Sequence, residues 1–199
     1  MALGTGLSVP FGNATAESGD SLWRRYSVQW PLLFEIGAKP GDSVFIGGYF
    51  GFSFGAEGSD VRIEGFCEDD DGDAENEIVC STVGFRLGLE LIYGFSPGDR
   101  VNPWLGYGIG WESQRQTIND RITRREEETT SSGLELARIM LGLDVRYKTL
   151  GFGPVIQAAI GRYTSSETAV NGDVTFDGDV ERPSLHGWLT LGIRGVVFP

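Results

Sequence analysis

A two-residue alternation runs along almost the whole chain and limits what it can fold into. Residues 83–94 show it best, with Val83, Phe85, Leu87, Leu89, Leu91 and Tyr93 alternating with Gly84, Arg86, Gly88, Glu90, Ile92 and Gly94. Residues 137–148 repeat it, and related patterns occupy 3–12, 26–37, 44–54, 105–112, 153–163 and 185–198. Alternate residues of an extended strand point to opposite faces. The sequence therefore predicts eight strands, each with a bulky apolar face and a small or charged face.

The connections between these strands alternate between short and long. Tight turns are predicted at 39–42, 96–99 and 149–151, and the first two share the letters PGD. Loops are predicted at about 13–20, 56–78, 114–132 and 165–183. In an up-and-down barrel, short turns then lie at one end and loops at the other, as in outer-membrane barrels with periplasmic turns and extracellular loops. We expect one domain, residues 1–199, with both termini periplasmic.

The apolar face is too bulky for the inside of an eight-stranded barrel. A soluble barrel places large apolar side chains inside, but here they would overfill the lumen and leave a glycine-rich wall in water. The reverse orientation places the large apolar side chains against lipid and the small residues in the interior. Tilted strands of about ten residues cross a membrane, and closure leaves no strand edge in lipid. The predicted fold is an all-β, eight-stranded antiparallel up-and-down transmembrane β-barrel.

Charge and hydropathy exclude several other classes of protein. No run of about 18 apolar residues occurs, which excludes a membrane-spanning helix. The net charge of −12 argues against nucleic-acid binding, which needs a basic surface. A signal peptide is expected for an outer-membrane protein and is presumed to have been removed.

Two cysteines, Cys67 and Cys80, flank an acidic run. A disulfide between them, closing a surface loop, is the preferred interpretation, with two free thiols as the alternative. Residues 57–77 contain ten acidic residues and one basic residue. An EF-hand is rejected because Cys67 and Ile78 fall where ligands are needed. Weak divalent-cation binding at 57–77 stays open beside a merely solvated acidic loop.

The small-residue face also carries charges of both signs. A network is predicted in the periplasmic half, made of Glu35, Arg86, Glu90, Asp144, Arg146 and Arg194. Further inward-facing charges are expected at Glu112, Arg138, Lys148 and Arg162. A narrow lumen brings such groups within pairing distance. The preferred hypothesis is a structural plug, and the alternative is a gated or lateral path for a small solute.

Aromatic residues of the apolar face are predicted to form belts at the two membrane interfaces. The loop-side belt is Tyr26, Trp30, Phe52, Phe54 and Trp111, and the turn-side belt is Tyr93, Tyr147, Phe152 and Phe198. Pro31 removes a backbone N–H from the second strand, so a bulge is expected there. His186, the only histidine, has Ser184 and Glu181 nearby, which raises a catalytic interpretation that chance placement explains better.

The chain resembles the small outer-membrane β-barrels of the OmpA, OmpX and OmpW type. The resemblance rests on the strand pattern over the whole length, the phrase from Trp104 to Trp111, and the near-terminal Phe198, and no short motif is specific to one member. It implies a Gram-negative outer membrane, insertion by the barrel-assembly machinery, and contact with outer-membrane lipids and lipopolysaccharide. A specific activity does not transfer with a fold.

The predicted function is a non-enzymatic outer-membrane barrel, without a cofactor, whose interior is plugged and whose loops serve surface interaction or envelope integrity. Three alternatives stay open: a narrow channel for small or apolar solutes, a lipid A-modifying enzyme, and a soluble ligand-binding barrel.

Overall fold

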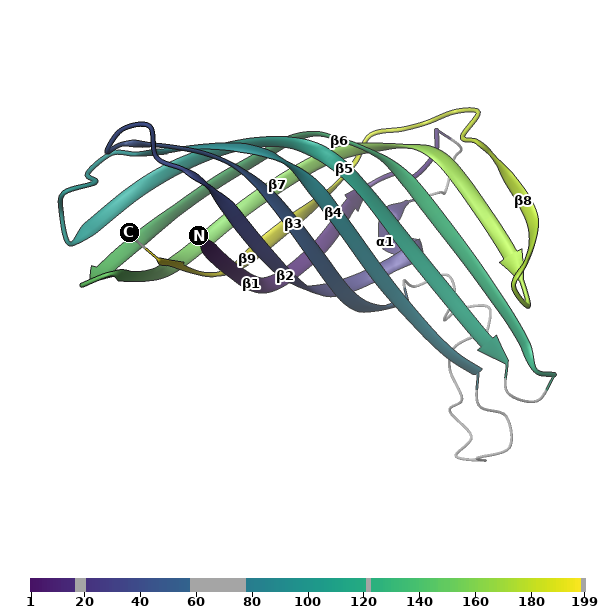
Figure 1. Ribbon diagram of the computed structural model, residues 1–199. Helices are drawn as coiled ribbons and strands as arrows, with labels where there is room; N and C mark the ends of the chain where they lie inside the picture. Colours follow the sequence, from purple (N-terminus) through teal and green to yellow (C-terminus); the bar gives the residue numbers. More distant parts are fainter. Residues whose placement is uncertain (17–20, 58–77, 121–122, 198–199) are drawn as a thin grey trace.

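The computed structural model describes residues 1–16, 21–57, 78–120 and 123–197, which form a tilted antiparallel barrel (Figure 1). The ring strands are β1 (Ala2–Gly12), β2 (Tyr26–Ala38), β3 (Val44–Glu57), β4 (Ile78–Gly94), β5 (Val101–Asp120), β6 (Arg125–Tyr147), β7 (Leu150–Val170) and β9 (His186–Val197). A short helix, α1 (Leu22–Arg25), and a strand outside the ring, β8 (Asp173–Asp179), complete the described elements. No helix in these residue ranges is long and apolar enough to cross a membrane.

Strand β9 closes the ring, because it pairs with β1 on one side and with β7 on the other. Starting from Ala2, the paired residues lead round all eight strands to His186 and back to β1 at Gly12. One circuit therefore shifts the register by ten residues, from position 2 to position 12. This stagger in eight strands corresponds to a strand tilt of roughly 40° and a lumen just wide enough for side chains.

The barrel is apolar outside and polar inside. Leu87, Leu89, Ile139 and Leu141 are 53%, 67%, 49% and 51% exposed on its outer wall. Among the described residues, sixteen polar or charged residues are buried against eleven hydrophobic ones, the reverse of a soluble core. Only a hydrocarbon solvent makes this arrangement favourable, since it satisfies the outward side chains and the closed backbone ladder together. The predicted transmembrane barrel is confirmed.

The strands continue well beyond the predicted loop boundaries. Strands β5 and β6 stay paired out to Asp120 and Arg125, and β7 continues to Val170 before β8 folds back on it. The expected loops 114–132 and 165–183 are therefore mostly hairpins. Their strands are rich in Ser, Thr, Gln and Glu on both faces, so they lack the alternation that reveals a half-buried strand.

Three short turns join the strands at the end of the barrel where both termini lie (Figure 1). Two of them contain the PGD letters, and Asp99 N donates to Ser96 O at 3.1 Å across the second. The third turn is only Lys148 and Thr149, with Lys148 at φ 57°, because Leu150 already pairs with Tyr147. This end is called the turn end below, and the opposite end the loop end.

The bulge expected at Pro31 lies elsewhere. Pro31 pairs with Ser53 on β3, and the register shift in β2 falls between Tyr26 and Gln29. On the other side, the β1–β2 pairing passes from Thr5–Leu32 directly to Ser8–Gln29 and omits the two positions opposite Pro31 and Trp30. A proline has no N–H to donate to the ladder, so the pairing of β2 with β1 is interrupted at this point without a change of register.

Candidate functional site

Arg194 organises the half of the interior nearest the turn end. Its Nη2 and Nε atoms donate to Glu35 Oε2 at 2.6 and 2.9 Å, and its Nη1 atom donates to Asp144 Oδ2 at 3.1 Å. Trp104 Nε1 donates to the other oxygen of Asp144 at 3.1 Å, and its ring centroid lies 4.7 Å from the guanidinium carbon. These four side chains are buried. A buried charge is tolerable only when it is paired in this way.

Tyr49 and Glu135 form the centre of the interior. The Tyr49 hydroxyl donates to Glu135 Oε1 at 2.6 Å, and the Arg138 guanidinium lies 4.1 Å from the Tyr49 ring centroid. Arg86 lies between two glutamates, with nitrogen atoms 3.8 Å from Glu135 Oε2 and 3.6 Å from Glu112 Oε2. Polar contacts therefore continue from the centre toward the loop end.

Glu112 and His186 contact each other nearer the loop end, through Oε1 and Nε2. The His186 ring stacks on Tyr163 with the two centroids 3.9 Å apart, and both residues are 1% exposed. Beside them Gln29 Nε2 donates to Gln114 Oε1 at 3.1 Å. The interior at this level is filled by aromatic, imidazole and amide groups.

An apolar cluster covers the loop-side mouth of the barrel. It consists of Ala14, Leu22, Tyr26, Tyr163 and Trp188, with Leu22 supplied by α1. Tyr26 and Trp188 have ring centroids 6.0 Å apart. The polar interior therefore ends in an apolar cap on this side.

The turn-side mouth opens instead into a cavity of about 410 Å³, here called the vestibule. Its walls include Phe45, Ile92 and Val196, and Trp104, Asp144 and Arg194 form its floor. Two smaller cavities beside Pro31, farther inside, have about 20 Å³ each, room for about one water molecule.

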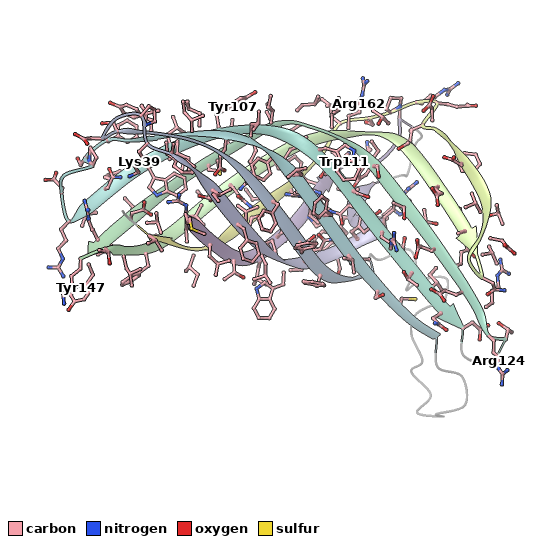
Figure 2. The ribbon with its side chains drawn as sticks, in the orientation of Figure 1. Lys39, Tyr107, Trp111, Arg124, Tyr147 and Arg162 are labelled. Atoms are coloured by element: carbon pink, nitrogen blue, oxygen red, sulfur yellow. The ribbon has the colours of Figure 1, made fainter. Side chains whose placement is uncertain are left out.

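Lys39, in the turn after β2, stands at the rim of the vestibule (Figure 2). Partial burial lowers the pKa of its ammonium group below the usual value. Asp144 and Asp42 raise this pKa, whereas Arg146 and Arg194 lower it. Lys39 is thus a cation in a place that disfavours its charge.

The six residues of the predicted charge network do not form one cluster. Glu35, Asp144 and Arg194 contact one another, whereas Arg86 belongs to the glutamate pair farther inside.

The other two predicted members are Glu90, which lies close enough to Glu35 and Arg194 to interact with their charges, and Arg146. Glu90 is 3% exposed, and neither of its carboxylate oxygens has a hydrogen-bond partner among the described residues. Arg146 is half-buried at the turn end, where its Nε atom donates to Lys148 O at 3.3 Å.

The inward orientation predicted for Lys148 and Arg162 is wrong. Lys148 lies in a turn, and Arg162 is exposed on the outer wall (Figure 2). The buried positions of β7 from Gly151 to Tyr163 are all odd-numbered, so the regular alternation of this strand points Arg162 outward.

Sequence reasoning missed Glu135, Tyr49 and Trp104 as interior residues. Glu135 is inward because of the β6 bulge, and the only signal was that Leu134 and Leu136 alternate out of phase with Ile139. Tyr49 and Trp104 alternate in step with the inward-facing glycines of their own strands. The two-residue alternation could therefore have predicted that both side chains point inward.

Seven of the described belt residues lie on the outer wall, and Tyr26 does not. Tyr26 is 1% exposed and belongs to the loop-side cap, because the bulge between Tyr26 and Gln29 turns it inward. The remaining members are exposed and outward: Trp30, Phe52, Phe54, Trp111, Tyr93, Tyr147 and Phe152. Phe198 lies outside the described residues, and the interfacial role of the set stays a prediction.

The catalytic interpretation of His186 with Ser184 and Glu181 has little geometric support. His186 is buried against Glu112, whereas Glu181 is exposed on the segment before β9. Cys80 lies on β4, and no described cysteine is free. Cys67 and the acidic stretch 58–77 lie outside the described residues, so both the disulfide and divalent-cation binding stay predictions.

The closed ring, the apolar outer wall and the charged interior define the chain as a transmembrane β-barrel of the outer-membrane type. Neither a family model nor a curated protein matches the sequence.

Several solved structures are similar over nearly the full length. Neisserial surface protein A (NspA) has a TM-score of 0.46 and 12% identity, covering 97% of this chain and 94% of that one. A major outer membrane protein from Thermus thermophilus has a TM-score of 0.47 and 14% identity, covering 98% and 100%. The outer membrane protein AlkL has a TM-score of 0.42 and 9% identity, covering 99% and 90%. Because the identities and TM-scores are this low, the fold class is assigned from the geometry of the barrel itself.

Proposed function

We propose that this protein is a non-enzymatic outer-membrane barrel whose interior is a structural plug. The observation that carries the proposal is the Arg194 cluster, in which one guanidinium reaches Glu35 and Asp144 from across the lumen. Contacts among Arg86, Glu112 and other interior groups, and then the apolar cap, occupy the rest of the interior. Such an interior stabilises the wall and leaves no room for a water-filled pore.

The surface function in this proposal belongs to the extended sheet at the loop end. Strand β8 pairs with β7 along one edge only, and it stands last in the order of the sheet. Val174 and Phe176 on this strand are 58% and 54% exposed. An edge strand with exposed apolar side chains can take up a partner by strand addition. The apolar wall contacts outer-membrane lipids and lipopolysaccharide, and the turn end with both termini faces the periplasm.

Conductance in planar lipid bilayers tests the plug. The refolded wild-type barrel is expected to leave the current at the baseline of protein-free detergent. The double variant Glu35→Ala/Arg194→Ala, which removes the largest cross-lumen contact, is expected to give measurable openings. Discrete wild-type openings at neutral pH would contradict the plug.

A narrow channel for small or apolar solutes is the second candidate. The vestibule and the two omitted pairs at Pro31 and Trp30 favour it, since they place an open mouth and an incomplete ladder in one barrel. Uptake of a small apolar dye into proteoliposomes, compared with protein-free liposomes, distinguishes this candidate from the plug.

Lipid A modification is the remaining alternative, and it depends on His186, whose ring is buried against Glu112. A lipid A mass profile that is the same with the wild type, with His186→Ala and without the protein is expected for a non-enzymatic barrel. A modification that disappears in His186→Ala would instead establish an enzyme.

A further inference from the structure

Arg162 is the first charged residue on the outward face of β7, counted from the turn end toward the loop end. The outward positions before it carry no charge, and they are Leu150, Phe152, Pro154, Ile156, Ala158 and Ile160. Figure 2 shows the Arg162 side chain pointing away from the barrel. An otherwise uncharged row of the outer wall therefore ends in a guanidinium group.

The height of Arg162 on the wall corresponds to the membrane interface at the loop end. Arg162 lies ten positions after Phe152, and a rise of about 3.3 Å per residue at a tilt of roughly 40° places it about 25 Å higher. The apolar band of an outer-membrane barrel is also about 25 Å tall. With Phe152 at the turn-side interface, Arg162 lies at the opposite interface, where a charge costs far less than at the midplane.

The two preceding strands have the same boundary at this height. Arg162 pairs with Leu134 on β6, and Leu134 pairs with Trp111 on β5, so an exposed row crosses the three strands. Two residues farther toward the loop end, the Ser132 hydroxyl donates to the Ser113 hydroxyl at 2.9 Å. Apolar side chains therefore give way to hydroxyl groups just above the level of Arg162.

The Arg162 guanidinium has no hydrogen bond or ion pair with another residue in the part of the chain that the structure describes. Its outward neighbours Leu134 and Ile160 are apolar and exposed. By contrast, Arg115 lies farther toward the loop end on β5 and contacts Glu128 at 3.2 Å. Arg162 is thus a cation with an apolar surrounding and free donors.

Other charged groups at this end do not neutralise Arg162. The first acidic residue beyond it on β7 is Glu167, roughly 16 Å along the strand, which exceeds the screening length of about 8 Å at physiological ionic strength. Glu181 and Arg182, on the segment between β8 and β9, contribute one charge of each sign. The positive charge of Arg162 is therefore available to an anion.

We propose that Arg162 binds the phosphate of an anionic lipid in the membrane leaflet at the loop end. The guanidinium donates to the phosphate oxygens, and the acyl chains lie against Leu134 and Ile160. The inference rests on the proposed function, because it needs lipid against the outer wall. It goes beyond that function by naming one headgroup chemistry and the residue that binds it.

The chemistry of an interfacial arginine favours a phosphate. Its apolar stem lies along the wall while its charged head reaches the headgroup level. The planar guanidinium matches two phosphate oxygens at once, and hydrogen bonds between charged groups are stronger than neutral ones. The choline of phosphatidylcholine compensates its own phosphate, so a lipid with a net negative phosphate head is preferred. One arginine near an anionic lipid surface corresponds to about a fivefold gain in binding.

Lipid titration in nanodiscs tests the site. The ¹⁵N-labelled full chain is refolded into phosphatidylcholine nanodiscs that contain an increasing fraction of phosphatidic acid. The Arg162 Nε–H resonance, assigned by its loss in Arg162→Gln, is followed by NMR. A saturable shift is expected, with half-saturation at a lipid fraction about fivefold lower than for Arg115 Nε–H.

Two ligand controls identify the group that is bound. Dioleoylglycerol, which has acyl chains but no phosphate, is expected to cause no saturable shift of Arg162 Nε–H. Inorganic phosphate added to pure phosphatidylcholine nanodiscs is expected to cause none either. An equal response to dioleoylglycerol means that no headgroup is recognised, and an equal response to inorganic phosphate assigns the site to a free anion. Either result overturns the proposal.

The backbone amide of Leu134 reports on the site in every variant, because Leu134 pairs with residue 162. Its response to phosphatidic acid is expected to weaken at least about fivefold in Arg162→Gln and to change less than about twofold in Arg115→Gln. Equal losses in the two variants indicate general attraction to the loop end and overturn the site. A chain that inserts without a selective Arg162 response overturns the phosphate site alone, whereas a chain that stays outside the nanodiscs contradicts the lipid-facing wall as well.

Discussion

The Arg194 guanidinium lies 2.6 Å from the Glu35 carboxylate and joins β9 to β2, two strands that β1 separates in the ring. The same guanidinium reaches Asp144 on β6, which is not a neighbour of β9 either. Backbone pairing connects only adjacent strands, so this contact braces the barrel across its lumen. The first prediction depends on this brace.

Arg194→Met is expected to destabilise the barrel by about 3–5 kcal/mol, because it leaves Glu35 and Asp144 buried without their counter-charge. The free energy of unfolding in urea, measured in lipid vesicles, is the quantity to compare. Arg146→Met removes a guanidinium at the half-buried rim and is expected to change stability by about 1 kcal/mol or less. Equal effects of the two substitutions would mean that the cross-lumen brace has no special role.

Gly88→Ala is expected to cost about 1–3 kcal/mol through overpacking. A methyl group at this position would lie 2.6 Å from Cζ of Tyr49, whose hydroxyl is held by Glu135. Gly98→Ala in a turn, where an added Cβ meets nothing within 4 Å, is the matched control. Heat-induced unfolding followed by gel mobility should show a lower midpoint for Gly88→Ala than for Gly98→Ala, and coinciding midpoints would refute the tight fit.

Leu89→Arg places a charge on the outer wall near the middle of β4, where the side chain is 67% exposed. A destabilisation of about 2–4 kcal/mol is expected in a bilayer, since an arginine at the midplane loses its hydration. Phe176→Arg on β8, outside the ring, should have little effect. The comparison is made on folding free energies in vesicles, and a harmless Leu89→Arg would argue that this wall faces water.

Lys39 is expected to make stability rise with pH on the alkaline side. Burial lowers its pKa below 10.5 in the folded barrel, so between the two values the unfolded chain holds a proton that the folded chain has released. Stability increases with pH wherever the unfolded state binds more protons. The free energy of unfolding of the wild type minus that of Lys39→Gln should therefore rise through this pH window. A difference that falls with pH would show that the pKa is raised.

Cys67 and Cys80 are expected to form a disulfide in the protein isolated under oxidising conditions. Intact mass measured with and without reduction, after alkylation of free thiols, decides the matter. Two alkylated cysteines before reduction would establish the alternative, a pair of free thiols. Cys80→Ser serves as the control, because its remaining cysteine must react in both conditions.

Leu89 and Arg86 illustrate how much of the fold followed from local pattern. They occupy opposite parities of one strand, and their orientations follow from strand geometry once the lipid-facing side is chosen. The same logic placed Glu35, Asp144 and Arg194 inside. It failed for Tyr26, because the bulge in β2 inverts parity without changing composition. Arg162 lies on the even-numbered, outward face of β7, so its inward assignment was wrong without any bulge.

The sequence by itself determined the strand class, the ring of eight and the inside-out polarity, because these depend on a two-residue period and on the bulk of one face. The tertiary structure alone decided which interior groups meet. Arg194 and Glu35 are 159 positions apart, and their contact depends on the stagger that the closed ring accumulates over eight strands. It also decided that the turn-side mouth stays hollow, since a cavity is set by the packing of side chains from many strands at once.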